Sequence, residues 1–105
     1  MIYTLTFNPC LDYTMHMPEL RTGAINRSTH ESCRCGGKGI NVSLVLRELG
    51  MPSVALGFAA GFSGNELERQ LRESGVDTDL VHLPHGMTRI NVKLRSGSTC
   101  VGADA

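Results

Sequence analysis

Strand-like and helix-like segments alternate along this chain, and their order leaves few possible folds. The first segment, IYTLTF, is rich in β-branched and aromatic residues and predicts a buried strand. A capping box formed by Ser63 and Glu66 predicts the start of the second helix. Strands are expected at residues 2–7, 53–58 and 79–83, and helices over residues 40–49 and from Ser63 to Gly75. This order is typical of a parallel sheet with right-handed crossovers, so the chain is predicted to be α/β.

Other segments predict strands that lie outside this main core. Residues 13–18 alternate only weakly, and residues 26–34 are polar, so both are expected to be exposed strands. In TRINVKL, residues 88–94, apolar and polar side chains alternate, which predicts a strand with one buried face. A tight turn is expected at Ser96 and Gly97, before a return strand.

Composition excludes several classes of protein. The 105 residues are enough for one small domain. Lys and Arg together number 10, as do Asp and Glu, and this balance argues against non-specific binding to nucleic acid. No apolar run approaches the ~20 residues that cross a bilayer, and the N-terminus lacks the features of a signal peptide. We therefore expect a cytoplasmic protein with no membrane partner. Its four cysteines are expected to be reduced thiols, and Cys33 with Cys35 is too weak a pattern to predict a metal site.

The stretch CGGKGINVS, residues 35–43, places three glycines and a lysine before the first helix. It is neither a Walker A loop nor a dinucleotide fingerprint, because Gly39 follows Lys38 and Val42 replaces the last glycine of the fingerprint. Free amides and the helix dipole at such a helix start favour anions and hydroxyl oxygens, and Asn41 could hydrogen-bond sugar hydroxyls. Alternatively, the glycines only make a tight turn and let the helix pack close to the sheet. From these residues alone, both explanations stay open.

Three motifs in order give the chain a resemblance to a known family. NPCLDYT at 8–14, GGKGINVS at 36–43 and TRINVKL at 88–94 resemble the N-terminal part of the ribokinase-like (PfkB) family of sugar kinases. The resemblance covers essentially the whole chain. It implies a partial ribokinase-like fold, with a mostly parallel sheet, flanking helices and β-lid strands over the sugar.

The resemblance also implies how the chain is divided. All of residues 1–105 would be an N-terminal fragment of one kinase domain. The core would comprise residues 1–12 and 36–87, and the lid strands would lie at about 13–35 and 88–105. Lids of this kind often pair between subunits, so a homodimer through the lid strands is expected.

The family's site residues can be matched to positions in this chain. Asp12 matches an acidic residue that binds sugar hydroxyls, and a carboxylate suits that task. Arg89 matches an arginine that holds the substrate's phosphate, and Arg27 is a less well aligned second cation. The sugar-binding turn is matched by Gly36, Gly37, Lys38 and Asn41. From the residues alone, Asp12 could instead cap a turn, and Lys38 and Arg89 could be ordinary surface cations.

The activity implied by the resemblance is ATP-dependent phosphorylation of fructose 1-phosphate to fructose 1,6-bisphosphate, with Mg²⁺ accompanying ATP. In the family, the catalytic aspartate and the ATP site lie in the C-terminal half. No D-T-x-G-D-like segment occurs among these 105 residues, so the chain is expected to hold no catalytic residue and to be inactive alone. The alternatives are a fragment of a tagatose-6-phosphate kinase, a non-catalytic module that binds sugar phosphate or dimerises, and an incompletely folded fragment.

Overall fold

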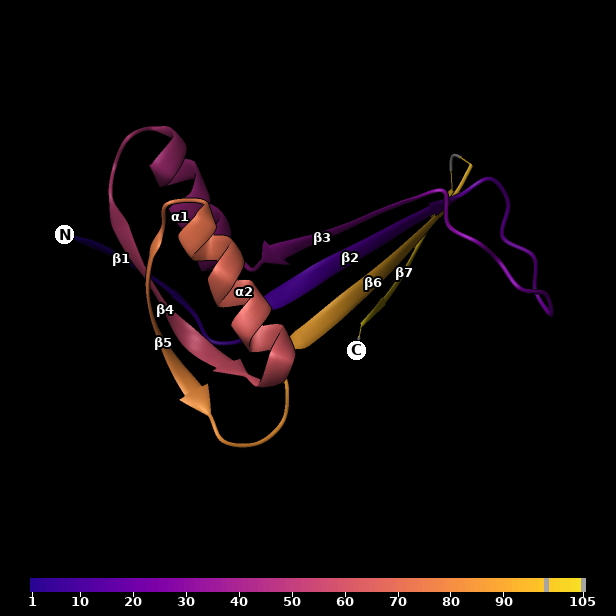
Figure 1. Cartoon of the computed structure of the whole chain (residues 1–105). Helices are drawn as coiled ribbons and strands as arrows, with labels where there is room; N and C mark the ends of the chain where they lie inside the picture. Colours follow the sequence, from indigo (N-terminus) through magenta and orange to yellow (C-terminus); the bar gives the residue numbers. More distant parts are fainter. Residues whose placement is uncertain (98, 105) are drawn as a thin grey trace.

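Two β-sheets and two helices make up the fold in the computed structural model, which describes residues 1–97 and 99–104 (Figure 1). The sheets meet where β1 ends and β2 begins. In chain order the elements are β1 (Ile2–Thr6), β2 (Cys10–Met17), β3 (His30–Gly36), α1 (Lys38–Glu48), β4 (Ser53–Ala60), α2 (Gly61–Glu73), β5 (Asp77–Leu83), β6 (Arg89–Ser96) and β7 (Thr99–Asp104).

The first sheet has three parallel strands in the order β1-β4-β5. α1 leads into β4, and α2 connects β4 to β5. Both helices pack on the same face of this sheet (Figure 1). The predicted α/β class with a parallel sheet and flanking helices is therefore confirmed.

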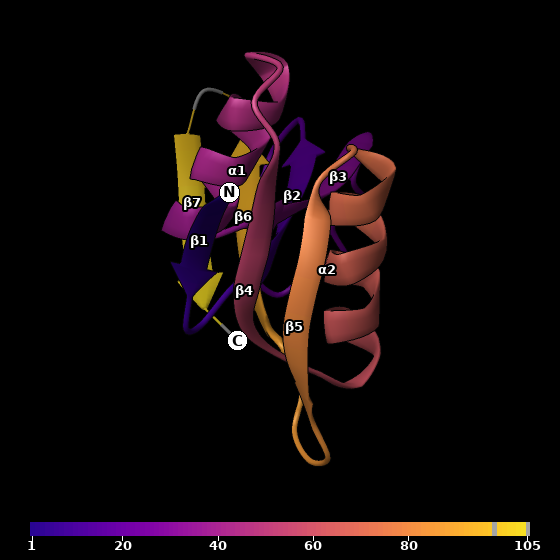
Figure 2. The same ribbon diagram turned by 90° about the vertical axis from the view of Figure 1, so that its left-hand side faces the viewer.

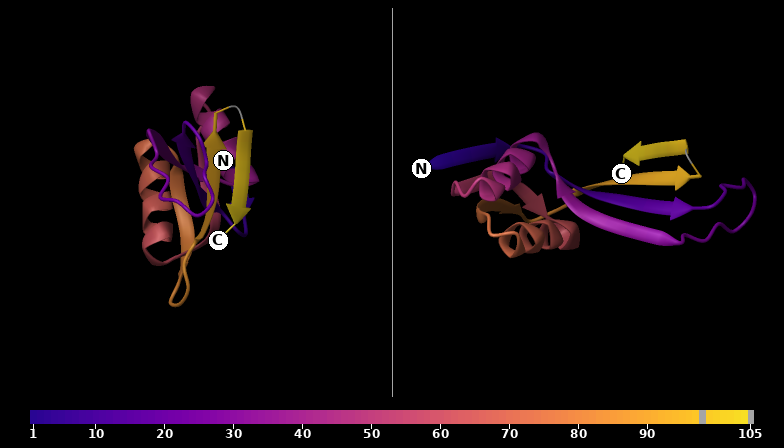
Figure 3. Two further views of the ribbon diagram at one scale, coloured as in Figure 1. Left: turned by 90° about the vertical axis from the view of Figure 1, so that its right-hand side faces the viewer. Right: turned by 90° about the horizontal axis from the view of Figure 1, so that it is seen from above.

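The second sheet has four strands in the order β3-β2-β6-β7 and projects away from the first sheet and its helices (Figures 1 and 3). β2 pairs antiparallel with β3 and parallel with β6, and β6 forms an antiparallel hairpin with β7. The molecule is consequently elongated, measuring 50 × 34 × 18 Å. Residues 98 and 105 of the predicted lid region lie outside the described residues.

The core lies between the three-stranded sheet and its helices. Two alanines of β4, Ala55 and Ala59, are fully buried and allow the helices to approach the sheet closely. The buried apolar cluster comprises Leu11, Ile40, Ala55, Ala59, Leu67, Leu71, Val76 and Leu80. Among the described residues, no helix is both long enough and apolar enough to cross a membrane.

The prediction that the first strand is buried was wrong. On β1 only Thr4 is buried, whereas Tyr3 is 63% and Leu5 55% exposed. Side chains alternate along a strand, so Thr4 faces α1 while Tyr3 and Leu5 face the opposite side. Figure 2 looks onto that side, which no described helix covers.

The predicted capping box was also wrong. α2 begins at Gly61, so Ser63 already lies inside the helix, and its hydroxyl donates a 2.8 Å hydrogen bond to the Thr88 carbonyl. The reason is that β4 continues to Ala60 and leads directly into the helix. Ala60 and Thr88 form two hydrogen bonds with each other. The Thr88 amide donates to the Ala60 carbonyl at 2.9 Å, and the Ala60 amide donates to Thr88 Oγ1 at 3.0 Å. Thr88 therefore fixes the start of β6 against the first sheet.

Candidate functional site

A hollow of about 530 Å³ lies between the four-stranded sheet and α1. β2 and β3 contribute Asp12, Thr14, Ser32 and Arg34 to its lining, and α1 contributes Asn41. Two residues singled out from the sequence, Asp12 and Asn41, therefore line the same hollow although 29 positions separate them. Carboxylate, hydroxyl, amide and guanidinium groups together can bind a polyhydroxylated anion.

The strand pairing orients Asp12. In the ladder, Asp12 pairs with Arg34 on β3 and with Asn91 on β6. Asn91 Nδ2 donates a 3.0 Å hydrogen bond to Asp12 Oδ1, and the Cys10 thiol donates to the same oxygen at 3.6 Å. These bonds hold one carboxylate oxygen, while Oδ2 has no hydrogen-bond partner among the described residues.

Gly36 leaves room for this carboxylate. A Cβ at position 36 would lie 2.5 Å from Asp12 Oδ2 and 3.3 Å from the Cys10 sulfur. Any larger residue would therefore have to displace the Asp12 side chain. This glycine serves the geometry of the site itself.

The other two glycines of the stretch serve packing. A Cβ at Gly39 would collide with Thr6 Oγ1 and the Leu5 carbonyl oxygen, and a Cβ at Gly37 would lie 2.8 Å from Thr6 Cγ2. Gly37 also has a φ of +128°, a conformation that other residues rarely adopt. Close packing of the helix start on β1, one of the two explanations left open by the sequence, thus accounts for Gly37 and Gly39.

α1 begins without a side-chain cap from its own N-cap residue, Gly37. Thr6 replaces that cap, because its Oγ1 accepts a 3.1 Å hydrogen bond from the Ile40 amide. The backbone N–H of Asn41 donates a 2.8 Å hydrogen bond to the Gly37 carbonyl, which closes the first turn of the helix. The Asn41 side chain is exposed on the hollow, and Lys38 is exposed at the first position of the helix.

Arg89 lies at the start of β6, paired with Cys10, on the same face of the sheet as Asp12. Its Nε is buried and has no hydrogen-bond partner among the described residues, and the same holds for Asn91 Oδ1. Burial raises the pKa of the Cys10 thiol, Asp12 raises it further, and Arg89 lowers it. A buried guanidinium nitrogen without a partner is costly unless an acceptor such as an anion binds it.

Arg27 does not join these residues. It is exposed in the loop between β2 and β3, at the end of the four-stranded sheet farthest from the first sheet (Figure 3). Of the residues predicted from the sequence, Asp12 and Asn41 line the hollow, whereas Gly36, Gly37, Lys38 and Arg89 do not. Gly36 and Arg89 lie next to Asp12 on the four-stranded sheet, because both pair with Cys10, and Arg27 lies at the tip of the sheet.

Sequence reasoning missed Thr14, Ser32, Arg34 and Gln70, all of which line the hollow. The alternation of side chains along β2 could have placed Thr14 on the same face as Asp12. Arg34 and Gln70 gave no such signal, because their positions depend on the strand register and on helix packing.

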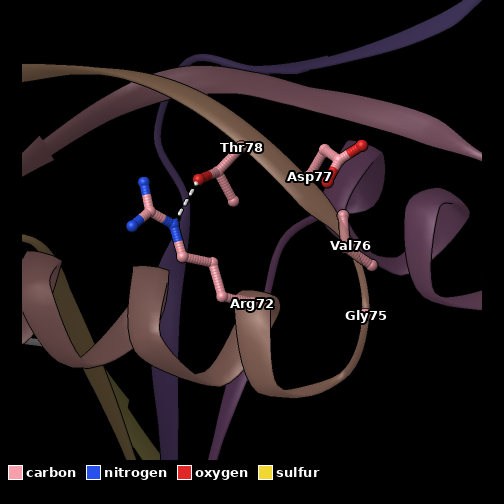
Figure 4. Close-up of a pocket in the computed structure, with 5 residues that line it drawn as sticks. All are labelled: Arg72, Gly75, Val76, Asp77 and Thr78. Atoms are coloured by element: carbon pink, nitrogen blue, oxygen red, sulfur yellow. Dashed lines mark hydrogen bonds between the residues drawn. The ribbon is translucent and has the colours of Figure 1, made fainter.

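A second hollow, of about 440 Å³, lies where α2 leads into β5 (Figure 4). It is lined by Arg72, Gly75, Val76, Asp77 and Thr78. Arg72 Nε donates a 3.1 Å hydrogen bond to Thr78 Oγ1, and its guanidinium lies 3.7 Å from Glu68. Because Arg72 is already bonded within the protein and no residue of the predicted site lies here, we assign this hollow no ligand.

The chain is similar to carbohydrate kinases in sequence and in fold. Residues 5–101 match the sequence model of the pfkB family of carbohydrate kinases. A 1-phosphofructokinase of Bacillus subtilis is 45% identical over 92% of the chain, and a D-tagatose-1-phosphate kinase of Bacillus licheniformis is 38% identical over 91%. Phosphofructokinase-2 of Escherichia coli, solved in complex with substrates and products, superposes with a TM-score of 0.85 at 29% identity, over 96% of the chain and 33% of that structure.

The chain is shorter than these relatives. It spans 32% of the Bacillus subtilis protein and 31% of the Bacillus licheniformis protein, or about a third of each.

Proposed function

The chain belongs to the pfkB family of carbohydrate kinases, and from this membership we propose that it forms the sugar-phosphate-binding part of an ATP-dependent kinase that converts fructose 1-phosphate to fructose 1,6-bisphosphate. The observation that carries the proposal is the meeting of Asp12 and Asn41 on one hollow. Phosphorylated tagatose is the second candidate substrate, because a relative of similar coverage is a D-tagatose-1-phosphate kinase.

Each proposed contact has a physical basis. Asp12 accepts hydrogen bonds from sugar hydroxyls through its free Oδ2, while Asn91 fixes the carboxylate. Asn41, with Gly36, Gly37 and Lys38 before it, contacts the sugar from the start of α1. Arg89 binds the phosphate, which would satisfy its unpaired Nε. Arg27 lies in the loop between β2 and β3, at the tip of the four-stranded sheet. It contacts the phosphate only if this loop is brought to a sugar-phosphate site.

ATP and Mg²⁺ are assigned to the full-length enzyme. Among the described residues, no group of three or more His, Cys, Asp or Glu side chains could hold a metal ion. The proposal gives residues 1–105 no part in holding the nucleotide or its Mg²⁺. In this proposal residues 1–105 bind, orient and shield the sugar phosphate.

We further propose that the four-stranded sheet acts as a lid and pairs with the lid of a second copy. The face opposite Asp12 carries Tyr13, Met15, Val92 and Leu94, all partly buried in one chain. A second sheet on this face would bury these apolar side chains. Closure of the four-stranded sheet over the hollow on its Asp12 face would exclude water from the sugar.

Calorimetric titration with fructose 1-phosphate tests the binding proposal. We expect saturable binding that weakens at least about tenfold in Asp12→Ala and in Arg89→Ala, because each variant loses a charge-assisted hydrogen bond. Asp79→Ala and Arg21→Ala are matched controls, since both side chains are exposed and lie outside the hollow. Equal affinity in all four variants would contradict the proposed site.

Competition between fructose 1-phosphate and the tagatose phosphates identifies the sugar in the same assay.

Residues 1–105 with ATP, Mg²⁺ and fructose 1-phosphate should release no ADP above a blank, because positioning of the nucleotide is absent. ADP release would contradict the assignment of catalysis to other parts of the kinase.

A further inference from the structure

We propose that Gln70 is a positioning residue that fastens the base of the four-stranded sheet to α2 and so holds the sugar-binding turn in place. The inference rests on the proposed function for its effect on sugar binding, but the fastening itself does not. β3 is an outer strand of the four-stranded sheet, and its outer edge has no strand partner among the described residues.

The Gln70 side chain bonds to this edge as a neighbouring strand would. Gln70 Oε1 accepts a 2.8 Å hydrogen bond from the Cys35 amide, and Gln70 Nε2 donates a 3.1 Å hydrogen bond to the Cys33 carbonyl. In a parallel ladder, one residue's N–H and carbonyl bond to two partner residues that lie two positions apart. The side-chain amide therefore reproduces one rung of a parallel ladder, from a helix.

A neighbouring ion pair orients the amide. Gln70 Nε2 also donates to Glu66 Oε2 at 3.0 Å, and Arg69 binds both oxygens of Glu66 at 2.7 Å. Arg69, and secondarily Gln70, lower the pKa of Glu66 to about 2, so its carboxylate stays an acceptor at neutral pH. The amide nitrogen consequently points to Glu66 and Cys33, and the oxygen points to the Cys35 amide.

The position of this contact gives it a role at the site. Cys35 immediately precedes Gly36, which lies against the Asp12 carboxylate. α1 begins at Lys38, two residues after Gly36. Gln70 itself lines the hollow with Asp12 and Asn41. Releasing β3 from α2 would let the Asp12 wall of the hollow shift relative to the Asn41 wall.

Hydrogen exchange tests the fastening without any ligand. In Gln70→Ala we expect the Cys35 amide to exchange at least about tenfold faster, because it loses its acceptor, while amides of β4 keep the wild-type rate. Asn65→Ala is the matched control, since Asn65 is an exposed amide side chain of the same helix that makes no hydrogen bond among the described residues. Unchanged exchange at Cys35 in Gln70→Ala would overturn the inference.

Gln70→Glu separates positioning from a general loss of stability. The new carboxyl group would lie beside the Glu66 carboxylate and the Cys33 carbonyl, and these neighbours would raise the pKa of the new carboxyl. Only the protonated carboxyl can donate a hydrogen bond as the Gln70 amide does. Relative to wild type at the same pH, the variant should bind fructose 1-phosphate about tenfold more weakly at about pH 8 and recover toward wild-type affinity at about pH 5. Taking the ratio at each pH removes the titration of the ligand's own phosphate.

The outcomes remain distinguishable. Gln70→Ala should stay weak across this range, and a pH-independent ratio for Gln70→Glu would overturn the positioning role. If the wild-type chain binds no sugar phosphate, the proposed function fails, and exchange at Cys35 still decides whether Gln70 fastens the sheet.

Discussion

At the scale of single residues, the site depends on which side chains are absent as much as on those present. Asp12 can lie across β3 only because position 36 has no side chain, and the carboxylate is then held by Asn91 and Cys10. Gly36 does not need an unusual backbone conformation, since its φ is not positive. Its requirement is purely steric.

We therefore predict that Gly36→Ala weakens sugar-phosphate binding and lowers stability by ~1–3 kcal/mol, the usual cost of overpacking. A double-mutant cycle measured by chemical denaturation checks the cause. In an Asp12→Ala background the alanine at position 36 meets no carboxylate, so its effect on unfolding should largely disappear. An equal loss of stability in both backgrounds would show that the clash lies elsewhere.

At the scale of elements, a chain of three hydroxyl groups joins β1, α1 and β4. Ser43 is fully buried on α1, and its Oγ lies 2.6 Å from Thr4 Oγ1 and 3.0 Å from Ser53 Oγ. These small side chains let the helix approach the sheet while satisfying one another's hydrogen bonds. This contact holds the N-terminal strand to the helix that carries Asn41.

Ser43→Ala should lower the free energy of unfolding by ~1–3 kcal/mol, because it leaves Thr4 and Ser53 buried without their partner. The triple variant Thr4→Val, Ser43→Ala, Ser53→Ala removes the unpaired groups as well. We expect its denaturation midpoint to lie closer to wild type than that of Ser43→Ala. A triple variant less stable than the single one would mean that shape, and not hydrogen bonding, dominates this contact.

At the scale of the whole molecule, the described residues leave two apolar faces uncovered. Parallel sheets are usually covered on both faces, yet Leu5 and Phe58 lie on the bare side of the first sheet, where Phe58 stacks against Phe7 with ring centroids 6.4 Å apart. The second face is the apolar side of the four-stranded sheet, to which β2 contributes Met15. The two faces lie on different sheets, so their association can be tested separately.

Sedimentation of two charge variants makes this test. Met15→Glu should abolish a dimer formed through the four-stranded sheet, because the carboxylate would be buried in it. Leu5→Glu should leave that dimer intact and reduce further association at high concentration, since Leu5 is 55% exposed on the other face. If Met15→Glu remains dimeric, the proposed pairing through the lid is wrong.

An incompletely folded chain is a separate alternative at this scale. Ile40 and Ser43 of α1 are buried against the first sheet, so a folded chain should protect the amides of residues 40–49 from exchange. The same exchange experiment that follows Cys35 reports these amides.

Local patterns in the sequence determined the order of strands and helices, the hairpin that β6 and β7 form, and the motifs of the kinase family. Periodicity, glycine positions and turn residues express preferences of neighbouring residues, so they can be recognised without knowing the fold. Asn41 was predicted from its place in the first turn of a helix, and Asp12 from the family motif to which it belongs.

Only the tertiary structure decided the features that depend on pairing between distant segments. The register of β2 with β3 and β6 brings Arg34 and Asn91 beside Asp12. The alternation of side chains within each strand indicates which residues share a face, but not which residues of distant strands pair. The exposure of β1, the space that Gly36 leaves and the bonds from Gln70 to β3 likewise depend on which segment lies next to each. Motifs in the sequence thus identified Asp12 and Asn41, and the packing of two sheets against two helices decided which other groups line the hollow with them.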